Sequence, residues 1–600
     1  AISPYLFIPA IEPLLRRIEM NENIHGIRLP SGRKIKTSAY ADDITGFVSR
    51  TRDLEELIKE FNMCSLITGL KLNLSKTEVL QINDGIQLNE QMQRQVNVVD
   101  HLKVTGVYFS CKTNMERNED MNFGEIERKI IRHANFMKTR HLSLIGRANA
   151  AKMMLLSQLN YVTSAIGVPD KYRKRFDKII YNFVWNGIDR INRKQQMLPY
   201  QNGGISFLGP TKMAHIGIIK WLRVRVNCDE RNLPPWAEWM DEDFAKMGGY
   251  TFIYYKNRGR GEKRGKIRLK LDFNEQIKNA FDALHCKEEG LETLESPYYN
   301  NSKIITDRML NGIKFRAELS KYGLNQIADF FEVNGEVRSV EQFIRGGIPR
   351  NKWLSIQAII REVKAMNIRD VEKRIKYAKP IGECVGPGKT GLEKIILRIN
   401  KTEIKVDNIT TKNIKNALTT NIIVTGKKRH EILTGFNIEE NEETNVRSFA
   451  NIRKVFIETK MRSFLTEYRN AAVYANKDYY KFGHREDDKC DFCEEPEQDF
   501  NHLFIDCLIV RELYDRMDRL LGIIPREGKE RWLGVTDEAT DYIYITMAWE
   551  IYRSNLAKEI PTLEKIIGQI KANYETEKAI ARTRNRMQRM RAKWEIGAIK

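Results

Sequence analysis

The chain has 600 residues, and its 100 lysines and arginines against 79 aspartates and glutamates give a formal net charge of +21. This length predicts about four domains. The positive surplus favours a polyanionic partner such as nucleic acid, with a solvated basic surface as the alternative. No apolar run approaches the ~18 to 20 residues that cross a bilayer, and no basic leader precedes a cleavage site, so we expect neither a membrane protein nor a secreted one.

The first predicted element is a helix at the N-terminus. Pro4 suits a first helical turn, and apolar residues recur from Leu6 to Ile18 with no earlier segment to cover them. We therefore expect this end of the chain to be a cut within a longer protein. The eight cysteines do not form the pattern of a disulfide scaffold, which favours a reducing compartment, the nucleus or the cytoplasm.

An acidic pair follows in the stretch KTSAYADDITGFV, residues 36–48. Asp42 and Asp43 lie between strand-like apolar segments, which places them at or near a hairpin turn. Because unpaired carboxylates are costly beside a core, the pair requires either a cation or a solvated turn.

The next elements predict an α+β layer. Residues 52–68 predict a helix, because apolar side chains recur at helical spacing and Gly69 follows. The alternating leucines of LKLNLSKTEVLQI, residues 70–82, and the segment LKVTGVYFS, residues 102–110, each predict a strand. From residue 125 to about 185 the periodicity becomes helical, and Ser143 is a candidate N-cap.

Four of these motifs together resemble a known family. SPYLFIPAIEPLL, YADD, GLKLNLSKTEVL and LKVTGVYFS occur in the order of the later palm motifs of reverse transcriptases, and the chain is similar to the LINE class of non-LTR retrotransposons. The stretch HLSLIGRANAAKMMLLSQLNYV is similar to the thumb of that class. The resemblance covers about residues 1–225 and 485–555.

The resemblance implies an RNA-directed DNA polymerase that takes an RNA template, a DNA primer or target, and dNTPs. Asp42 would be a direct ligand of catalytic Mg²⁺, Asp43 a supporting charge at the same metal site, and Lys76 a neighbour of the departing pyrophosphate. A solvated hairpin tip is the alternative for the acids, and an ordinary surface lysine for Lys76. Arg147 and Lys152 would belong to the nucleic-acid face of the thumb, although a five-residue spacing separates them by about 140° on a helix.

The family also implies features that this chain lacks. Such polymerases place another metal-binding aspartate on an earlier palm strand, and that strand and the fingers are missing here. We therefore expect that the chain alone does not polymerise. The sequence also shows no endonuclease, neither one ahead of the polymerase nor one after the last cysteine.

A second constellation lies in KCDFCEEPEQDFNHLFIDCLI, residues 489–509. The spacing of Cys490, Cys493, His502 and Cys507 predicts a closed tetrahedral Zn²⁺ site, with a metal-free buried thiol cluster as the alternative. The same motif resembles the C-terminal cysteine–histidine motif of LINE proteins, and it is more typical of nucleic-acid binding than of catalysis. Because His502 and Cys507 are five residues apart, we expect a break in the helix near residues 505–506.

Two basic segments complete the candidate nucleic-acid contacts. The tail clusters Arg582, Arg584 and Arg586, for which phosphate contact and a frayed, solvated helix are equal alternatives. The run KNRGRGEKRGKIRLKLDF, residues 256–273, suits a nucleic-acid-binding loop or a linker.

The predicted fold is an α+β palm remnant followed by a mainly α-helical thumb and a C-terminal region with a small zinc knuckle. Its predicted segments are the palm at 1–115, the thumb at 116–190, a connection at 191–250, a mostly helical linker at 251–480, the knuckle at 481–520 and a basic helical tail at 521–600. Two functions remain open. One is an N-terminally truncated retrotransposon reverse transcriptase, and the other is a non-catalytic nucleic-acid-binding protein derived from such an element.

Overall fold

The structure, a computed structural model, describes residues 3–82, 88, 90–111, 115–245, 249–250, 253, 271–284, 294, 319, 324, 326–366, 368–378, 392, 395–399, 402–419, 426–439, 448–449, 452, 458–535 and 537–594. The chain forms two compact units. The first unit comprises residues 1–128, 159–172 and 212–420, and the second comprises 129–158, 173–211 and 421–600. No helix in the described ranges is long and apolar enough to cross a membrane.

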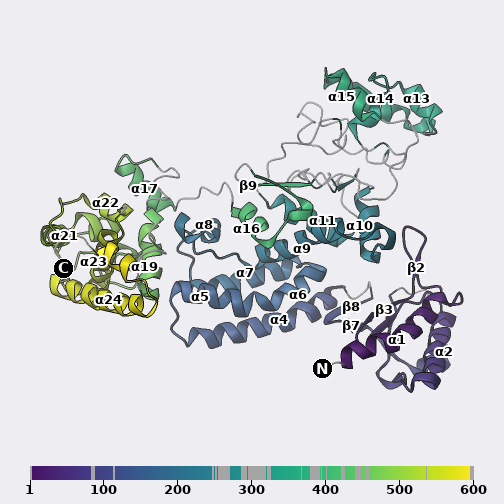
Figure 1. Cartoon of the computed structure of the whole chain (residues 1–600). Helices are drawn as coiled ribbons and strands as arrows, with labels where there is room; N and C mark the ends of the chain where they lie inside the picture. Colours follow the sequence, from purple (N-terminus) through teal and green to yellow (C-terminus); the bar gives the residue numbers. More distant parts are fainter. Residues whose placement is uncertain are drawn as a thin grey trace. The chain divides into compact units, whose positions relative to one another are not determined.

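The N-terminal part combines helices with four of the five two-stranded sheets found among the described residues (Figure 1). Its elements are α1 (Ser3–Met20), β1 (Ile27–Arg28), β2 (Lys34–Ile35), β3 (Thr37–Tyr40), β4 (Asp43–Gly46), α2 (Thr51–Thr68), a 3-10 turn (Leu74–Lys76), β5 (Glu78–Leu80), α3 (Glu90–Gln95), β6 (Asn97–Val99), β7 (His101–Val104) and β8 (Val107–Ser110). The pairs β1–β2, β3–β4 and β7–β8 are antiparallel, and β5–β6 is parallel.

Helices α1 and α2 form the small core beneath this layer. Leu14 and Ile18 of α1 are buried against Leu57 and Cys64 of α2. Helix α2 ends as predicted at Gly69, whose φ of +75° suits glycine and whose amide donates to the Ser65 carbonyl over 2.9 Å. Two rigid helices therefore support the strands that carry the acidic pair.

Two predicted strands differ from the structure. The leucines of residues 70–74 do not form a strand, because the oxygens of Asn73 instead accept bonds from Lys76 N at 3.1 Å and Ser75 Oγ at 2.7 Å, which favours a 3-10 turn. Residues 102–110 form a hairpin and not one strand. Its two-residue turn, Thr105–Gly106, has positive φ at both positions, the geometry that joins antiparallel strands tightly.

The buried carboxylate of Asp53 ties α2 to the segments on both sides of the strands. It accepts bonds from His25 Nδ1 at 3.0 Å and from the amides of His25 and Ser49 at 3.2 Å each. Burial raises the pKa of Asp53, but these hydrogen bonds outweigh burial and hold the pKa below its ordinary value. The unfolded chain therefore binds this proton more readily, so the stabilisation is present at neutral pH and is lost as the pH falls through the folded-state pKa.

Asp53→Asn should destabilise the first unit by about 2 kcal/mol at neutral pH, because charged hydrogen-bond acceptors of this kind are lost. Urea unfolding followed by circular dichroism measures this difference, which should shrink as the pH falls through the lowered folded-state pKa of Asp53, because wild-type Asp53 is then also protonated. The exposed Asp100→Asn serves as control and should change stability by less than about 0.5 kcal/mol. Equal effects of the two variants at neutral pH would contradict the role of Asp53.

Helices dominate the rest of the chain. The predicted thumb contains α4 (Met115–Lys138), α5 (Leu144–Ala150), a π-helical turn (Ala151–Leu155), α6 (Ser157–Ile166) and α7 (Asp170–Trp185). Ser143 caps α5 as predicted, since its side chain accepts the amide of Gly146 at 3.2 Å. The first unit continues with α9 (Pro210–Val226), α10 (Pro235–Ala245), α11 (Asp272–Asp282), α13 (Val340–Arg345), α14 (Trp353–Ala365), α15 (Val371–Tyr377), β9 (Ile396–Ile399), β10 (Thr402–Lys405) and α16 (Thr411–Thr419).

The second unit adds α8 (Arg193–Met197), α17 (Lys427–Gly435), α19 (Thr459–Arg469), α20 (Asn476–Lys481), a π-helical turn (His502–Asp506), α21 (Leu508–Leu521), α22 (Gly528–Leu533), α23 (Glu538–Ala557), α24 (Leu563–Thr583) and α25 (Met587–Trp594). Its core is aromatic, with ring contacts that link Phe464, Tyr468, Phe500 and Phe504 into one cluster. The predicted fold class, a small α+β part followed by a mainly helical chain, is confirmed.

Candidate functional sites

The acidic pair lies at the tip of the β3–β4 hairpin, as predicted. The register pairs Tyr40 with Asp43 and Ala39 with Ile44, so Ala41 and Asp42 form a two-residue turn and Asp43 begins β4. Both carboxylates are exposed. The hairpin therefore presents two adjacent acidic side chains to solvent, where a hard cation with its water ligands can reach them.

The turn is strained at Ala41. Its φ of +54° lies in the left-handed region, which an alanine adopts at a cost that glycine does not incur. Tight hairpin turns require positive φ at this first central position. Strain retained in an exposed turn beside two carboxylates is a feature often found at functional sites.

Lys76, the third predicted catalytic residue, ends the 3-10 turn before β5, and its side chain is exposed. Its backbone amide is held by Asn73 over 3.1 Å, which fixes where the side chain leaves the turn. The assignments of Asp42, Asp43 and Lys76 to catalysis stay predictions.

The predicted zinc ligands come together in the second unit. Their ligand atoms all lie within 4.8 Å of one another, a slightly looser set than the expected ~4 Å, which is the separation that bond lengths near 2.3 Å impose. Cys493 Sγ lies 3.2 Å from His502 Nε2, and Cys490 Sγ lies 4.0 Å from Cys507 Sγ. Three thiols and one imidazole in this arrangement fit a closed tetrahedral Zn²⁺ site.

The first two ligands, Cys490 and Cys493, lie on a tight turn. The amide of Glu494 donates to the Cys490 carbonyl over 3.0 Å, and the amide of Cys490 donates to the Glu495 carbonyl over 2.9 Å. Glu494 adopts a φ of +61°, which reverses the chain directly after Cys493. The turn thereby aims both sulfur atoms toward the same point.

The other two ligands are brought together by a π-helical turn. His502–Asp506 is π-helical, the amide of Cys507 donates to the His502 carbonyl over 2.9 Å, and the backbone of Cys507 is not helical. In a helix with bonds between residues i and i+5, five residues make little more than one turn, so both side chains leave on the same side. The expected break in the helix is thus present, and its form is a π-helical turn.

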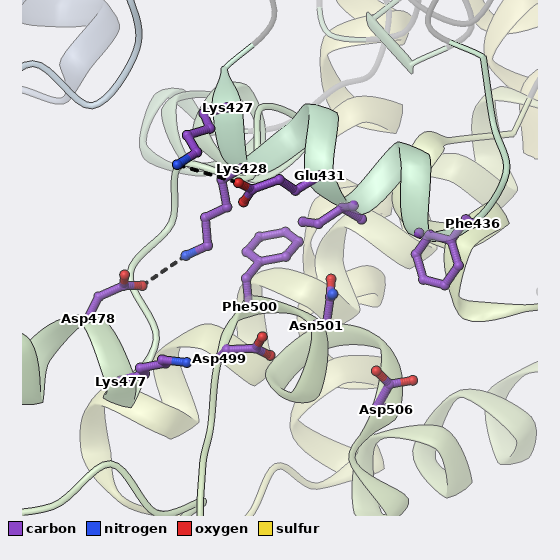
Figure 2. A pocket seen from close by; sticks show the side chains of 12 residues that line it. Lys427, Lys428, Glu431, Phe436, Lys477, Asp478, Asp499, Phe500, Asn501 and Asp506 are labelled. Carbon is purple, nitrogen blue, oxygen red and sulfur yellow. Dashed lines mark hydrogen bonds and ion pairs between the residues drawn. The ribbon is translucent and has the colours of Figure 1, made fainter.

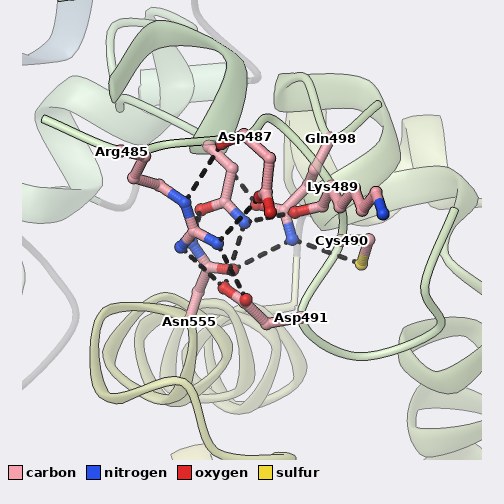
Figure 3. Close-up of polar contacts among 8 residues, drawn as sticks. Arg485, Asp487, Lys489, Cys490, Asp491, Gln498 and Asn555 are labelled. Atoms are coloured by element: carbon pink, nitrogen blue, oxygen red, sulfur yellow. Dashed lines mark hydrogen bonds and ion pairs between the residues drawn. The ribbon is translucent and has the colours of Figure 1, made fainter. Parts of the chain in front are cut away.

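A buried polar network supports the cysteine turn (Figure 3). Gln498 Nε2 donates to Cys490 Sγ over 3.2 Å and to Asn555 Oδ1 over 2.9 Å, and Asn555 in turn donates to Asn476 over 3.1 Å. Arg485 holds Asp491 through two bonds of 2.8 Å each. Together with a hydrogen bond from Cys507, the Gln498 amide lowers the pKa of the Cys490 thiol, which favours the thiolate that a metal requires.

This supporting network could not be predicted from the sequence. Gln498 lies inside the motif, but an amide among acidic residues carries no spacing signal. Asn476 and Asn555 are 22 and 57 residues away from Gln498 along the chain. Only the packing of α20 and α23 against the motif brings them to it.

The predicted thumb residues have different surroundings. Arg147 donates to the Val184 carbonyl over 2.7 Å and to the Leu142 carbonyl over 2.6 Å, and burial lowers the pKa of its guanidinium. These contacts join α5 to the end of α7 and give Arg147 a structural role, and its assignment to the nucleic-acid face stays a prediction. Lys152 lies in the π-helical turn after α5, 3.5 Å from Asn149 Oδ1, and its assignment stays a prediction.

The predicted tail residues Arg582, Arg584 and Arg586 are exposed where α24 ends and α25 begins, and their side chains make no ion pair or hydrogen bond to any described residue. Helix α25 itself is docked and not frayed, and phosphate contact by the three arginines stays a prediction. Trp594 Nε1 donates to Glu577 over 3.0 Å, and its ring meets the ring of Tyr542 edge to face. Of the basic run at 256–273, residues 256–270 lie outside the described residues.

Residues 1–109 match the family model described as reverse transcriptase (RNA-dependent DNA polymerase). The matched range includes the acidic hairpin and Lys76, and it ends in β8. This finding supports a reverse transcriptase origin for the N-terminal segment that carries the four motifs.

Proposed function

From this reverse transcriptase segment, we propose that the chain is the C-terminal part of an RNA-directed DNA polymerase of a LINE-type non-LTR retrotransposon. Its partners are then an RNA template, a DNA primer or target, and dNTPs. The observation that carries the proposal is the YADD hairpin within the matched segment, which presents Asp42 and Asp43 side by side on a strained two-residue turn.

In this proposal Asp42 and Asp43 hold Mg²⁺, with Asp42 as the direct ligand. A Mg²⁺ ion held there would lower the pKa of the primer hydroxyl and stabilise the leaving oxygen of the triphosphate. In this proposal Lys76, whose side chain is exposed, would lie near the departing pyrophosphate. The backbone strands β3 and β4 keep the carboxylates fixed, because a metal-binding turn must be mounted on rigid elements.

We also propose that the chain alone is inactive. Among the described residues, Cys490, Cys493, His502 and Cys507 form a group of metal-ligand side chains close enough to share one ion. Asp42 and Asp43 have no third His, Cys, Asp or Glu side chain near enough to join them in such a group. A site for two metal ions requires further carboxylates. Another part of the polymerase therefore supplies the rest of the metal site.

The remaining segments serve nucleic-acid binding in this proposal. Residues 116–190 act as the thumb, with Lys152 at its nucleic-acid face, 191–250 connect the thumb to the linker at 251–480, and the knuckle at 481–520 binds structural Zn²⁺. The tail at 521–600 contacts phosphates through its exposed arginines.

Primer extension on an RNA template tests the proposal. The full-length protein that contains this chain should extend a DNA primer in the presence of Mg²⁺, and the chain alone should bind the primer–template without extending it. The second candidate, a non-catalytic nucleic-acid-binding protein, is favoured by the acidic pair and the tail arginines, neither of which has a metal-sharing or ion-pair partner among the described residues. Binding by both proteins without any extension would support the second candidate and contradict the first.

The tail makes a separate prediction. Replacing Arg582, Arg584 and Arg586 with alanine should weaken nucleic-acid binding at low salt and reduce the slope of log K against log[salt] by about 2 to 3, because each lost phosphate contact releases roughly 0.7 to 0.9 fewer counterions. Fluorescence anisotropy over a salt series measures the slope. The matched lysine triple variant keeps the charge and should keep the slope. An unchanged slope in the alanine variant would contradict phosphate contact.

A further inference from the structure

Helices α13, α14 and α15 of the first unit lie together at residues 340–377 (Figure 1). One side of α14 belongs to the core and consists of the buried residues Ile356, Ile359, Ile360 and Val363. Because these apolar residues recur at spacings of three and four, they occupy a single side of the helix. Another side of α14 is left to solvent, in a segment that the sequence predicted only as a mostly helical linker.

The exposed side of α14 carries an aromatic ring, an amide and two cations in one row. The row consists of four exposed residues, Trp353, Gln357, Arg361 and Lys364. Their spacings place them within an arc of about 80° and along about 16 Å of the helix axis. Trp353 is 37% exposed, and it is the one exposed tryptophan in the described ranges. Large aromatic side chains at the surface are typical of interfaces.

The segment around this row is strongly basic. From residue 345 to residue 369 the sequence has six lysines and arginines and a single acid, Glu362. Arg361, whose side chain is 80% exposed, lies 3.8 Å from Glu362, which is too far for a hydrogen bond. Lys364, and Arg350 just before the helix, are exposed and make no ion pair or hydrogen bond to any described residue. The positive charge of this surface is therefore not offset within the described part of the chain.

Other cations of the chain have internal partners. In the same group of helices, the buried Arg338 donates to the Phe331 carbonyl over 2.8 Å. Figure 2 shows a pocket of the second unit in which Lys428 pairs with Asp478 at 3.0 Å. The cations on the exposed side of α14 hold no such contact, so they are available to an external anion.

We propose that the exposed side of α14, with the turn before it, binds a single-stranded segment of nucleic acid. Trp353 offers a ring on which an unpaired base stacks, and Arg361 and Lys364 meet phosphates along the strand. Gln357, between them, has both donor and acceptor atoms for a base edge. Stacking favours a single strand, because the bases of a duplex are already stacked on one another. The proposal rests on the nucleic-acid role of the chain but not on polymerisation.

An anionic membrane surface is the competing partner for a basic helix with an exposed tryptophan. Helices that lie on membranes bury a broad apolar face in the lipid. The apolar face of α14 is already buried in the protein, and only Trp353 and Leu354 remain exposed as large apolar side chains of this helix. The charge and the single aromatic ring therefore favour nucleic acid.

Trp353→Ala in the full chain tests the stacking contact. The probe is a short, fluorescently labelled single-stranded RNA, and anisotropy measures its binding. We expect binding about tenfold weaker than that of wild type, the effect of losing one stacked base. Trp353→Phe keeps a ring and should restore most of the affinity. Leu354→Ala, which removes the neighbouring exposed apolar side chain, is the matched control and should bind like wild type.

Arg361→Ala combined with Lys364→Ala tests the phosphate contacts. This double variant should reduce the slope of log K against log[salt] by about 1.4, because each single-strand phosphate contact releases roughly 0.7 counterion. Arg16→Ala combined with Lys59→Ala is the control, since it removes two exposed cations of α1 and α2 in the same unit. The control should keep the slope of wild type. Thermal unfolding of all variants should match that of wild type, because the replaced side chains are exposed.

The outcomes are distinct. Equal RNA binding by the Trp353→Ala and Leu354→Ala variants, or an unchanged salt slope in the α14 double variant, would overturn the assignment. Binding to phosphatidylserine-containing vesicles that depends on Trp353 and Leu354, without any effect of Trp353→Ala on RNA binding, would also overturn it. If the full-length protein does not extend primers while Trp353→Ala still weakens RNA binding, the polymerase proposal fails and the α14 assignment stands.

Discussion

Asp42→Asn in the full-length protein should reduce RNA-templated primer extension by several orders of magnitude, because the substitution removes a metal ligand on which nucleotidyl transfer depends. Binding of RNA should stay nearly unchanged, since Asp42 makes no phosphate contact in this proposal. The turn should also keep its shape, because the β3–β4 register is formed by backbone bonds and both positions of the pair are exposed. Single-turnover extension and anisotropy on the same protein preparation measure the two properties.

Asp100→Asn is the matched control for this experiment. Asp100 is an exposed carboxylate in the same matched segment, between β6 and β7, and its substitution should leave extension unchanged. If the Asp42→Asn variant extends the primer as fast as the Asp100→Asn variant, the hairpin is not part of the catalytic site.

Cys493→Ser should release about one zinc per chain and destabilise the second unit around residues 485–515, because the metal links the cysteine turn to the π-helical turn and its binding energy is folding energy. The first unit shares no ligand with this site and should stay folded. Metal analysis by mass spectrometry gives the stoichiometry. Hydrogen exchange should locate the loosened backbone within 485–515 and, through the Gln498 network, near Asn555 of α23.

Cys228→Ser is the control, since Cys228 is a free cysteine of the first unit that bonds the Val224 carbonyl and lies outside the ligand set. It should keep the zinc and the exchange pattern of wild type. Wild-type protein with reduced cysteines and less than about half an equivalent of zinc would show that the spacing alone does not make a metal site.

The sequence predicted the features that depend on local patterns. The 52–68 helix, the cap at Ser143 and the hairpin that presents Asp42 each follow from residues within one or two turns of the chain. The five-residue separation of His502 and Cys507 likewise requires a break in the helix if both are to bind one ion. Local hydrogen bonding and ligand geometry decide these features, and both can be read from short stretches.

Features decided by distant contacts were not predictable. The sequence predicted Arg147 as a cation on the nucleic-acid face of the thumb. In the structure its guanidinium donates hydrogen bonds to the carbonyls of Leu142 and Val184. One local feature was missed as well: the leucines at 70–74 have the alternation of a strand, yet the side chain and carbonyl of Asn73 bond Ser75 and Lys76 and stabilise a 3-10 turn instead. The supporting amides of the metal site come from three separated segments. In each case a specific hydrogen bond determines the structure, and the spacing of residues along the sequence does not reveal that bond.

The π-helical turn between His502 and Cys507 also determines which changes in length the motif can tolerate. With four intervening residues, both side chains reach one side only because the backbone bonds skip from i to i+5. Shortening the gap by one residue would place the ligands at i and i+4, where an ordinary α-helix aligns them. Lengthening it by one would rotate Cys507 away in either kind of helix. Related motifs should therefore show deletions at this position and not insertions.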